Sequence, residues 1–153
     1  MQTIQPAAIV PQASNTALYR VEETFGGDNV LLEVDLNKLT PERAIELCNF
    51  WSSSGHYVES EDGNPIRAAV RLFGSWIISN MSQGGGTDFS PDYMSPDGDP
   101  HPGLIWSAEV HEADGWGGTD DGSPFGWCGI RCVAAEVASI NFYSVELKEV
   151  KHA

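Results

Sequence analysis

Residues 64–86 read NPIRAAVRLFGSWIISNMSQGGG, and the rest of the fold is organised around them. Asn64 can cap a helix, Pro65 fits its first position, and the three glycines at 84–86 end it. Between these signals, apolar residues recur at steps of three and four. The recurring positions are Ile66, Ala69, Val70, Phe73, Ile77 and Met81, widened by Ala68, Leu72 and Trp76. So broad an apolar face predicts that this helix is the central packing element.

Two strands and a second helix are predicted on the N-terminal side. Residues 18–25 (LYRVEETF) and 30–36 (VLLEVDL) have the composition of strands. The segment between them, GGDN, tolerates the positive φ angles of a tight turn, which predicts an antiparallel hairpin. Thr40 as cap and Pro41 as first helical residue predict a helix over residues 41–53. The polar segment between the two helices, SSGHYVESEDG, is predicted to be a linker.

The C-terminal half is less regular. Prolines and aspartates predict a long surface loop at about residues 84–103. Residues 104–112 fit both the alternation of a strand and the spacing of a short helix, and we favour the helix. Residues 129–137 (GIRCVAAEV) and 139–150 (SINFYSVELKEV) predict a second hairpin. The expected order is β-β-α-α-(α)-β-β, an α+β two-layer domain whose antiparallel sheet of about four strands packs against two or three helices.

Length and terminal composition bound the class of protein. The chain of 153 residues fits one domain, expected over residues 18–153 after a loose polar lead-in at 1–17. The lead-in lacks the basic and long apolar regions of a secretory signal, and no run of about 18 apolar residues could span a membrane. Three cysteines do not make a disulfide framework. These features predict a cytoplasmic protein with buried thiols.

Charge is concentrated in one region. The formal net charge is -14, and no lysine or arginine lies between Arg71 and Arg131. Nine acids of this region form the candidate protein-binding face: Asp88, Asp92, Asp97, Asp99, Glu109, Glu112, Asp114, Asp120 and Asp121. Such a charge disfavours direct contact with nucleic acid or anionic lipid and favours a basic protein surface or cations.

The stretch DGWGGTDDGSPFGWCGI, residues 114–130, is a candidate metal loop, ligand-binding lip or acidic turn. Clustered aspartates and glycines suit calcium, but the EF-hand pattern is absent. His101, His111, Cys128 and Cys132 have side chains that can bind zinc, but their spacing in the sequence matches no known zinc site. We therefore predict neither a metal nor a cofactor.

Four aromatic residues accompany the acids: Trp106, Trp116, Phe125 and Trp127. They could form a stacking platform for a sugar or another small ligand, or they could anchor the loops to the core. We favour anchors. For catalysis, His56, beside Tyr57 and Glu59, is the histidine nearest a plausible concavity. Because no nucleophile elbow, phosphate loop or dinucleotide fingerprint occurs, a non-enzymatic protein is predicted, with a ligand- or metal-binding domain and a small hydrolase as alternatives.

Several segments resemble a bacterial family, domain of unknown function 2528. They are residues 31–51 (LLEVDLNKLTPERAIELCNFW), residues 63–78 (GNPIRAAVRLFGSWII), and Gly115-Trp116, Asp121-Gly122-Ser123 and Gly129-Ile130. The resemblance spans roughly residues 21–150, and this chain differs in its longer lead-in and its Pro/Asp-rich insertion before Leu104. It implies the strand-helix-helix-strand order and a setting among small acidic proteins of proteobacteria, phages, plasmids and integrated elements. The family has no assigned activity, so no catalytic residue is implied.

The setting and the charge together predict an accessory protein of a phage or mobile element that binds a host protein. A face of acids interspersed with aromatics can steer a basic partner and can imitate the phosphates of DNA. A nucleic-acid-handling or defence protein is the expected target, as for anti-CRISPR-like inhibitors. This hypothesis follows from class rather than from single residues, and the simpler alternative is that the acids only keep the protein in solution.

Overall fold

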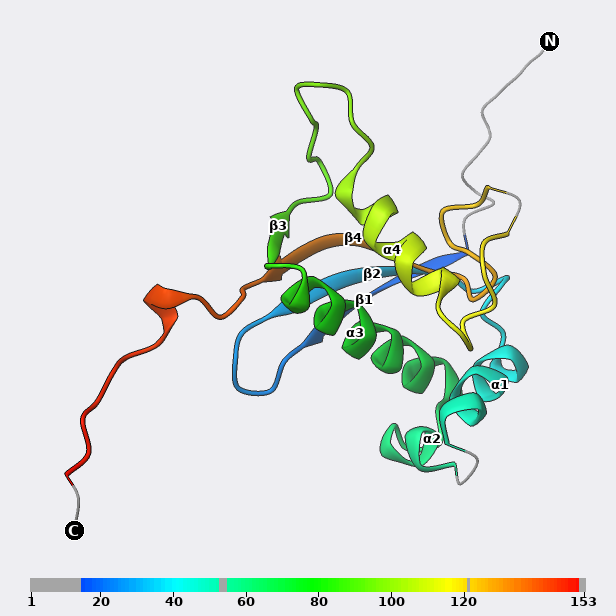
Figure 1. The fold of residues 1–153 in the computed structure, drawn as a ribbon. Coiled ribbons are helices and arrows are strands. Elements are labelled where there is room, and N and C mark those ends of the chain that lie inside the picture. Colours follow the sequence, from blue (N-terminus) through cyan, green and yellow to red (C-terminus); the bar gives the residue numbers. More distant parts are fainter. Residues whose placement is uncertain (1–14, 53–54, 121, 152–153) are drawn as a thin grey trace.

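A computed structural model of the chain describes residues 15–52, 55–120 and 122–151 (Figure 1). The strands are β1 (Thr16–Glu22), β2 (Asn29–Asp35), β3 (Thr87–Phe89) and β4 (Ile130–Val137). The helices are α1 (Pro41–Trp51), α2 (His56–Ser60), α3 (Pro65–Gln83) and α4 (Pro102–Glu112). The strands form one antiparallel sheet in the order β1-β2-β4-β3, which confirms the α+β fold class. Residues 1–14 of the expected lead-in lie outside the described residues, and β1 begins at Thr16.

The predicted hairpin and the central helix both form, but β1 ends at Glu22 instead of Phe25, and residues 23–28, not a tight turn at 26–29, connect it to β2. β1 pairs with β2 over seven residues, and Val30, Leu32 and Val34 of β2 are fully buried on the side of the sheet that faces the helices. α3 supplies Phe73, Ile77 and Met81 to the same core, each with no exposed surface. The predicted caps also form: Thr40 Oγ1 accepts from the Arg43 N–H at 3.2 Å, and Asn64 Oδ1 accepts from the Arg67 N–H at 3.1 Å.

The segment between α1 and α3, predicted to be a linker, contains the short helix α2. Among the side chains of α2, Val58 packs against the core. The helix has five residues, and one apolar contact in a single turn produces no repeating pattern for sequence reasoning to detect.

The second predicted hairpin does not form, because only the first of its two strands is present. β4 forms as expected, but its antiparallel neighbours are β2 and β3, and residues 139–150 pair with neither. β3 lies inside the segment expected to be loop. Gly86 explains this position: its φ is +83°, and a Cβ there would lie 2.7 Å from the carbonyl oxygen of Val137. Only glycine allows the chain to approach β4 closely enough for Thr87–Phe89 to pair with it.

The ambiguous residues 104–112 are confirmed as helical and belong to α4, which lies against the edge of β4 where the short β3 has ended. Two buried polar side chains of α4 bind the backbone there. Ser107 Oγ accepts from the Cys132 N–H at 2.8 Å, and His111 Nε2 donates to the Ile130 carbonyl at 2.7 Å. α4 thus satisfies backbone groups that a longer β3 would otherwise bind.

Candidate protein-binding surface

The outward side of α4 combines apolar and acidic side chains. Leu104 and Ile105 are 42% and 53% exposed, although both are large aliphatic residues. Residues four and eight positions further along lie on the same side of the helix. Together they line a shallow groove of about 650 Å³, whose walls include Pro100, Leu104, Ile105, Ala108, Glu109 and Glu112. We call this groove and its walls the α4 surface.

The loop at residues 90–101 adjoins the α4 surface, and Figure 1 shows it projecting beyond β3 and the start of α4. His101 closes the base of this loop. Its Nε2 donates to the Ser90 carbonyl at 3.0 Å, and its Nδ1 accepts from the Gly103 N–H at 3.0 Å. The loop exposes Met94 and Tyr93 beside its acids. It therefore extends the mixed apolar and acidic character of α4.

Seven of the nine predicted acids are exposed in this region, and we call them the acidic surface. They are Asp88 on β3, Asp92, Asp97 and Asp99 in the loop, Glu109 and Glu112 on α4, and Asp114 after it. Within the described ranges, none of the seven forms an ion pair. Unpaired carboxylates repel one another and give the region a negative potential that attracts cations or a basic protein.

The other two acids differ. Asp120 is partly buried and pairs with Lys38, so its charge is already compensated. Asp121 lies outside the described residues. Lys38 also donates to the Gly126 carbonyl at 3.3 Å, and Arg43 donates to the Trp127 carbonyl at 2.8 Å. The sequence contains no local signal for these two cations, because each contacts a loop more than 80 positions away.

The four predicted aromatic residues lie against the body of the domain. Trp116 has no exposed surface, and Trp106 and Trp127 are partly buried and pack against the core. The guanidinium carbon of Arg43 lies 4.1 Å from the centre of the Trp127 ring. The corresponding distance from Arg131 to the Phe125 ring is 5.0 Å. These contacts suit anchors of the loop at 114–129 better than a platform for stacking a ligand.

The histidines and cysteines considered for zinc bind separate backbone groups. Cys128 Sγ donates to Phe125 and Cys132 Sγ to Ala134, while His101 and His111 make the contacts given above. Burial raises the pKa of Cys128 and of Cys132 to about 12, so both are protonated thiols at neutral pH. In the part of the chain that is described, no three His, Cys, Asp or Glu side chains are grouped to hold a metal ion.

His56, the candidate base, is the first residue of α2 and is exposed. Its carbonyl oxygen accepts a hydrogen bond from Ser60 Oγ at 2.9 Å. A hollow beside α2 is lined by its neighbour Tyr57 rather than by His56. This placement gives no support to a catalytic role.

The burial of His111 makes the stability of the fold depend on pH. Loss of hydration lowers its pKa below the ordinary 6.5, and the Ile130 carbonyl opposes this only in part. The unfolded chain therefore binds more protons than the folded chain just below pH 6.5. The contribution of neutral His111 to the free energy of unfolding is therefore fully present above pH 6.5 and decreases as the pH falls below it.

We expect the melting temperature to decrease as the pH is lowered from about 7.5 to about 5.5. The decrease should be smaller in the His111→Gln variant. Thermal unfolding followed by circular dichroism measures both slopes. The variant keeps His56 and His101, so the difference between the slopes isolates His111. Equal slopes would show that the wild-type dependence comes from other groups.

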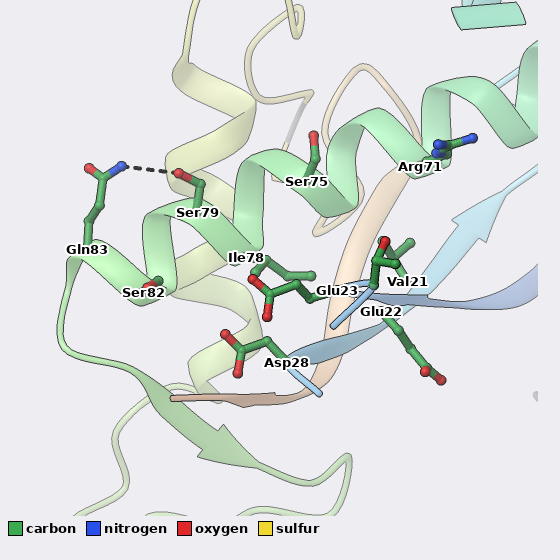
Figure 2. Close-up of a pocket in the computed structure, with 11 residues that line it drawn as sticks. Val21, Glu22, Glu23, Asp28, Arg71, Ser75, Ile78, Ser79, Ser82 and Gln83 are labelled. Atoms are coloured by element: carbon green, nitrogen blue, oxygen red, sulfur yellow. Dashed lines mark hydrogen bonds between the residues drawn. The ribbon is translucent and has the colours of Figure 1, made fainter. Parts of the chain in front are cut away.

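One groove was not anticipated from the sequence. It has a volume of about 580 Å³ and lies between the β1–β2 hairpin and α3 (Figure 2). Val21 and Glu23 line the hairpin side, and Ile78 and Ser79 line the helix side. It depends on the distance between two elements and therefore has no local sequence signal.

The described elements define a two-layer α+β protein with an open antiparallel sheet and an acidic surface around α4. Residues 29–147 match the family model described as protein of unknown function (DUF2528), and the chain belongs to this family. Neither the curated proteins nor the solved structures gave a match to the chain. Within the described ranges, no helix is both long and apolar enough to cross a membrane.

Proposed function

We propose that the protein is a non-enzymatic cytoplasmic binder that docks stoichiometrically on a basic protein through the α4 surface and the acidic surface. The observation that carries the proposal is the exposed pair Leu104 and Ile105 beside Glu109 and Glu112. Apolar side chains at the centre of a contact supply most of the binding energy once water is excluded. Carboxylates around them accelerate encounter with a basic partner and disfavour acidic ones.

The partner that suits this surface is a nucleic-acid-handling protein of the host. Such a protein presents lysines and arginines to phosphates, and a row of exposed carboxylates offers a similar charge pattern. A setting among small acidic proteins of phages and mobile elements, which the family resemblance implies, would favour the same choice, because a defence protein that binds nucleic acid is a useful target for such an element. The protein would then act as an inhibitor that mimics DNA.

Two double variants test the acidic surface. Glu109→Lys with Glu112→Lys changes the acidic surface, whereas Glu46→Lys with Glu59→Lys changes exposed acids on α1 and α2. Each pair changes the net charge from -14 by four, to -10. We expect the first pair to lower the association rate by about tenfold or more at low salt and to flatten its salt dependence. The second pair should have a much smaller effect.

The partner is first captured from host lysate on immobilised protein at low and moderate salt and identified by mass. Association rates of the purified partner with wild type and both variants are then measured by surface plasmon resonance. Equal losses in the two double variants would show that only total charge matters. Capture of no protein at either salt would count against the proposed function and favour a small-ligand screen.

A further inference from the structure

After β4, the chain forms an arm, residues 139–150, that leaves the domain. The Ala138 N–H donates to Asp28 Oδ1 at 3.0 Å, and beyond this point Figure 1 shows the orange and red segment running away from the sheet. Six large apolar side chains of the arm are between 59% and 98% exposed: Ile140, Phe142, Tyr143, Val145, Leu147 and Val150. Contiguous apolar exposure of this extent is typical of a surface that binds another surface.

The arm has the sequence of a strand that lacks a partner. Tyr143, Val145 and Leu147 alternate with polar residues, so an extended arm would place these three side chains on one face and Phe142 on the other. In the free arm, Phe142–Ser144 form a single 3-10 turn, η2, which has to extend before the arm can pair as a strand. Within the described chain, neither side of β4 is free to pair with the arm. β2 occupies one side, and β3 and α4 occupy the other. The pattern that predicted a strand therefore requires a different edge.

β1 offers such an edge. It is the outermost strand of the sheet and, among the described residues, pairs only with β2. Two hollows flank its outer side against α3, with volumes of about 580 and 190 Å³. They adjoin, since both are lined by Val21, Glu22 and Arg71, and we call the pair the β1–α3 groove. In Figure 2 the hairpin and α3 face each other across this groove.

We infer that two copies of the chain exchange arms, each arm adding a strand to β1 of the other copy. The added strand satisfies the free backbone groups of the β1 edge, and its alternate apolar side chains enter the β1–α3 groove. Residues 142–148 match the length of β1, which has seven residues. Ile78, Val70 and Tyr19 supply apolar contacts in the groove. A two-fold exchange covers both arms and both edges at once.

The area is sufficient for a specific dimer. Tyr143 buries roughly 150–250 Å² per arm when it enters the groove, Phe142 buries a similar area on the opposite face, where Leu18 of β1 is 62% exposed, and two arms double these figures. The aliphatic side chains and the groove walls add to it, so the total exceeds the roughly 1,000 Å² that a specific interface needs. The family model extends through residue 147, so most of the arm belongs to the region that the family shares. Docking on a second copy also agrees with Figure 1, in which the arm runs away from β1 and α3 of its own chain.

Light scattering coupled to size-exclusion chromatography tests the exchange. One chain has a mass of 16.6 kDa, so wild type is expected at twice this mass, 33.2 kDa. Truncation after Ala138 removes the arm, and Ser79→Trp fills the groove from an exposed position on α3. Each variant is expected to raise the dimer dissociation constant by at least about 100-fold and to elute as a monomer. Glu46→Trp, at an exposed position on α1, is the matched control and should remain dimeric.

Mixing the two monomeric variants gives the sharpest result, because the truncated chain keeps its groove and the Ser79→Trp chain keeps its arm. A heterodimer with one docked arm is expected only from this mixture, and misfolded variants could not form it. A monomeric wild type, including one with its arm in its own groove, would overturn the exchange. A dimer that survives truncation would place the interface elsewhere, and a dimeric Ser79→Trp variant would overturn docking in the groove.

Discussion

Replacement of Trp116 by alanine is expected to lower the free energy of unfolding by about 3–5 kcal/mol. The Trp116 side chain has no exposed surface. Its ring forms a T-shaped pair with Phe73 of α3, with ring centres 5.3 Å apart, and its centre lies 6.3 Å from that of Trp76 on the same helix. Removing it leaves a cavity between the loop at 114–129 and α3, since close-packed neighbours relax only partly. Urea denaturation followed by circular dichroism measures the loss.

Trp116→Phe is the matched control. It keeps an aromatic ring against Phe73 and removes an indole N–H that, within the described structure, is buried without a hydrogen-bond partner. We expect it to cost less than half as much as the alanine variant, because the smaller ring leaves a smaller cavity and no unsatisfied donor. A cost below about 1 kcal/mol for alanine would show that Trp116 is not a core anchor.

Replacement of Gly103 by alanine is expected to destabilise the fold by about 1–3 kcal/mol. At most helical positions the same change stabilises by roughly 0.5–1 kcal/mol, because glycine loses more backbone entropy on folding. At Gly103 the new Cβ would lie 2.2 Å from the carbonyl oxygen of Cys132. That oxygen belongs to the backbone of a central strand, so α4 must move away. Ser107 and His111 would then lose their contacts with β4.

Whether Gly103→Ala lowers or raises the free energy of unfolding shows how closely α4 packs on β4. Leu104→Ala alters the neighbouring residue on the exposed side of α4 and should cost much less, because Leu104 is 42% exposed. Both variants are compared with wild type by urea denaturation. A more stable Gly103→Ala variant would mean that α4 does not pack directly on the edge of β4.

The candidate protein-binding surface was only partly predictable from the sequence. Seven acids could be named because charge is a property of composition, and exposed loops accommodate it. The ion pair between Asp120 and Lys38 could not be predicted, since 82 positions separate the two residues and no local pattern relates them. The exposure of Leu104 and Ile105 depended on which side of α4 faces β4. That choice is made by Ser107 and His111, whose hydrogen bonds draw the other side inward.

Residues close together in the chain were enough to specify α1, α3 and the β1–β2 hairpin. Caps such as Thr40 and Asn64 act within three residues, and the connection between β1 and β2 spans residues 23–28, so their energetics are local. The neighbours of β4 were settled only by tertiary packing. β3 has three residues and pairs because Gly86 permits a close approach, while the arm has a clear strand pattern but no free edge beside β4. A strand's partner is set by which backbone groups remain unsatisfied, and that depends on the whole fold.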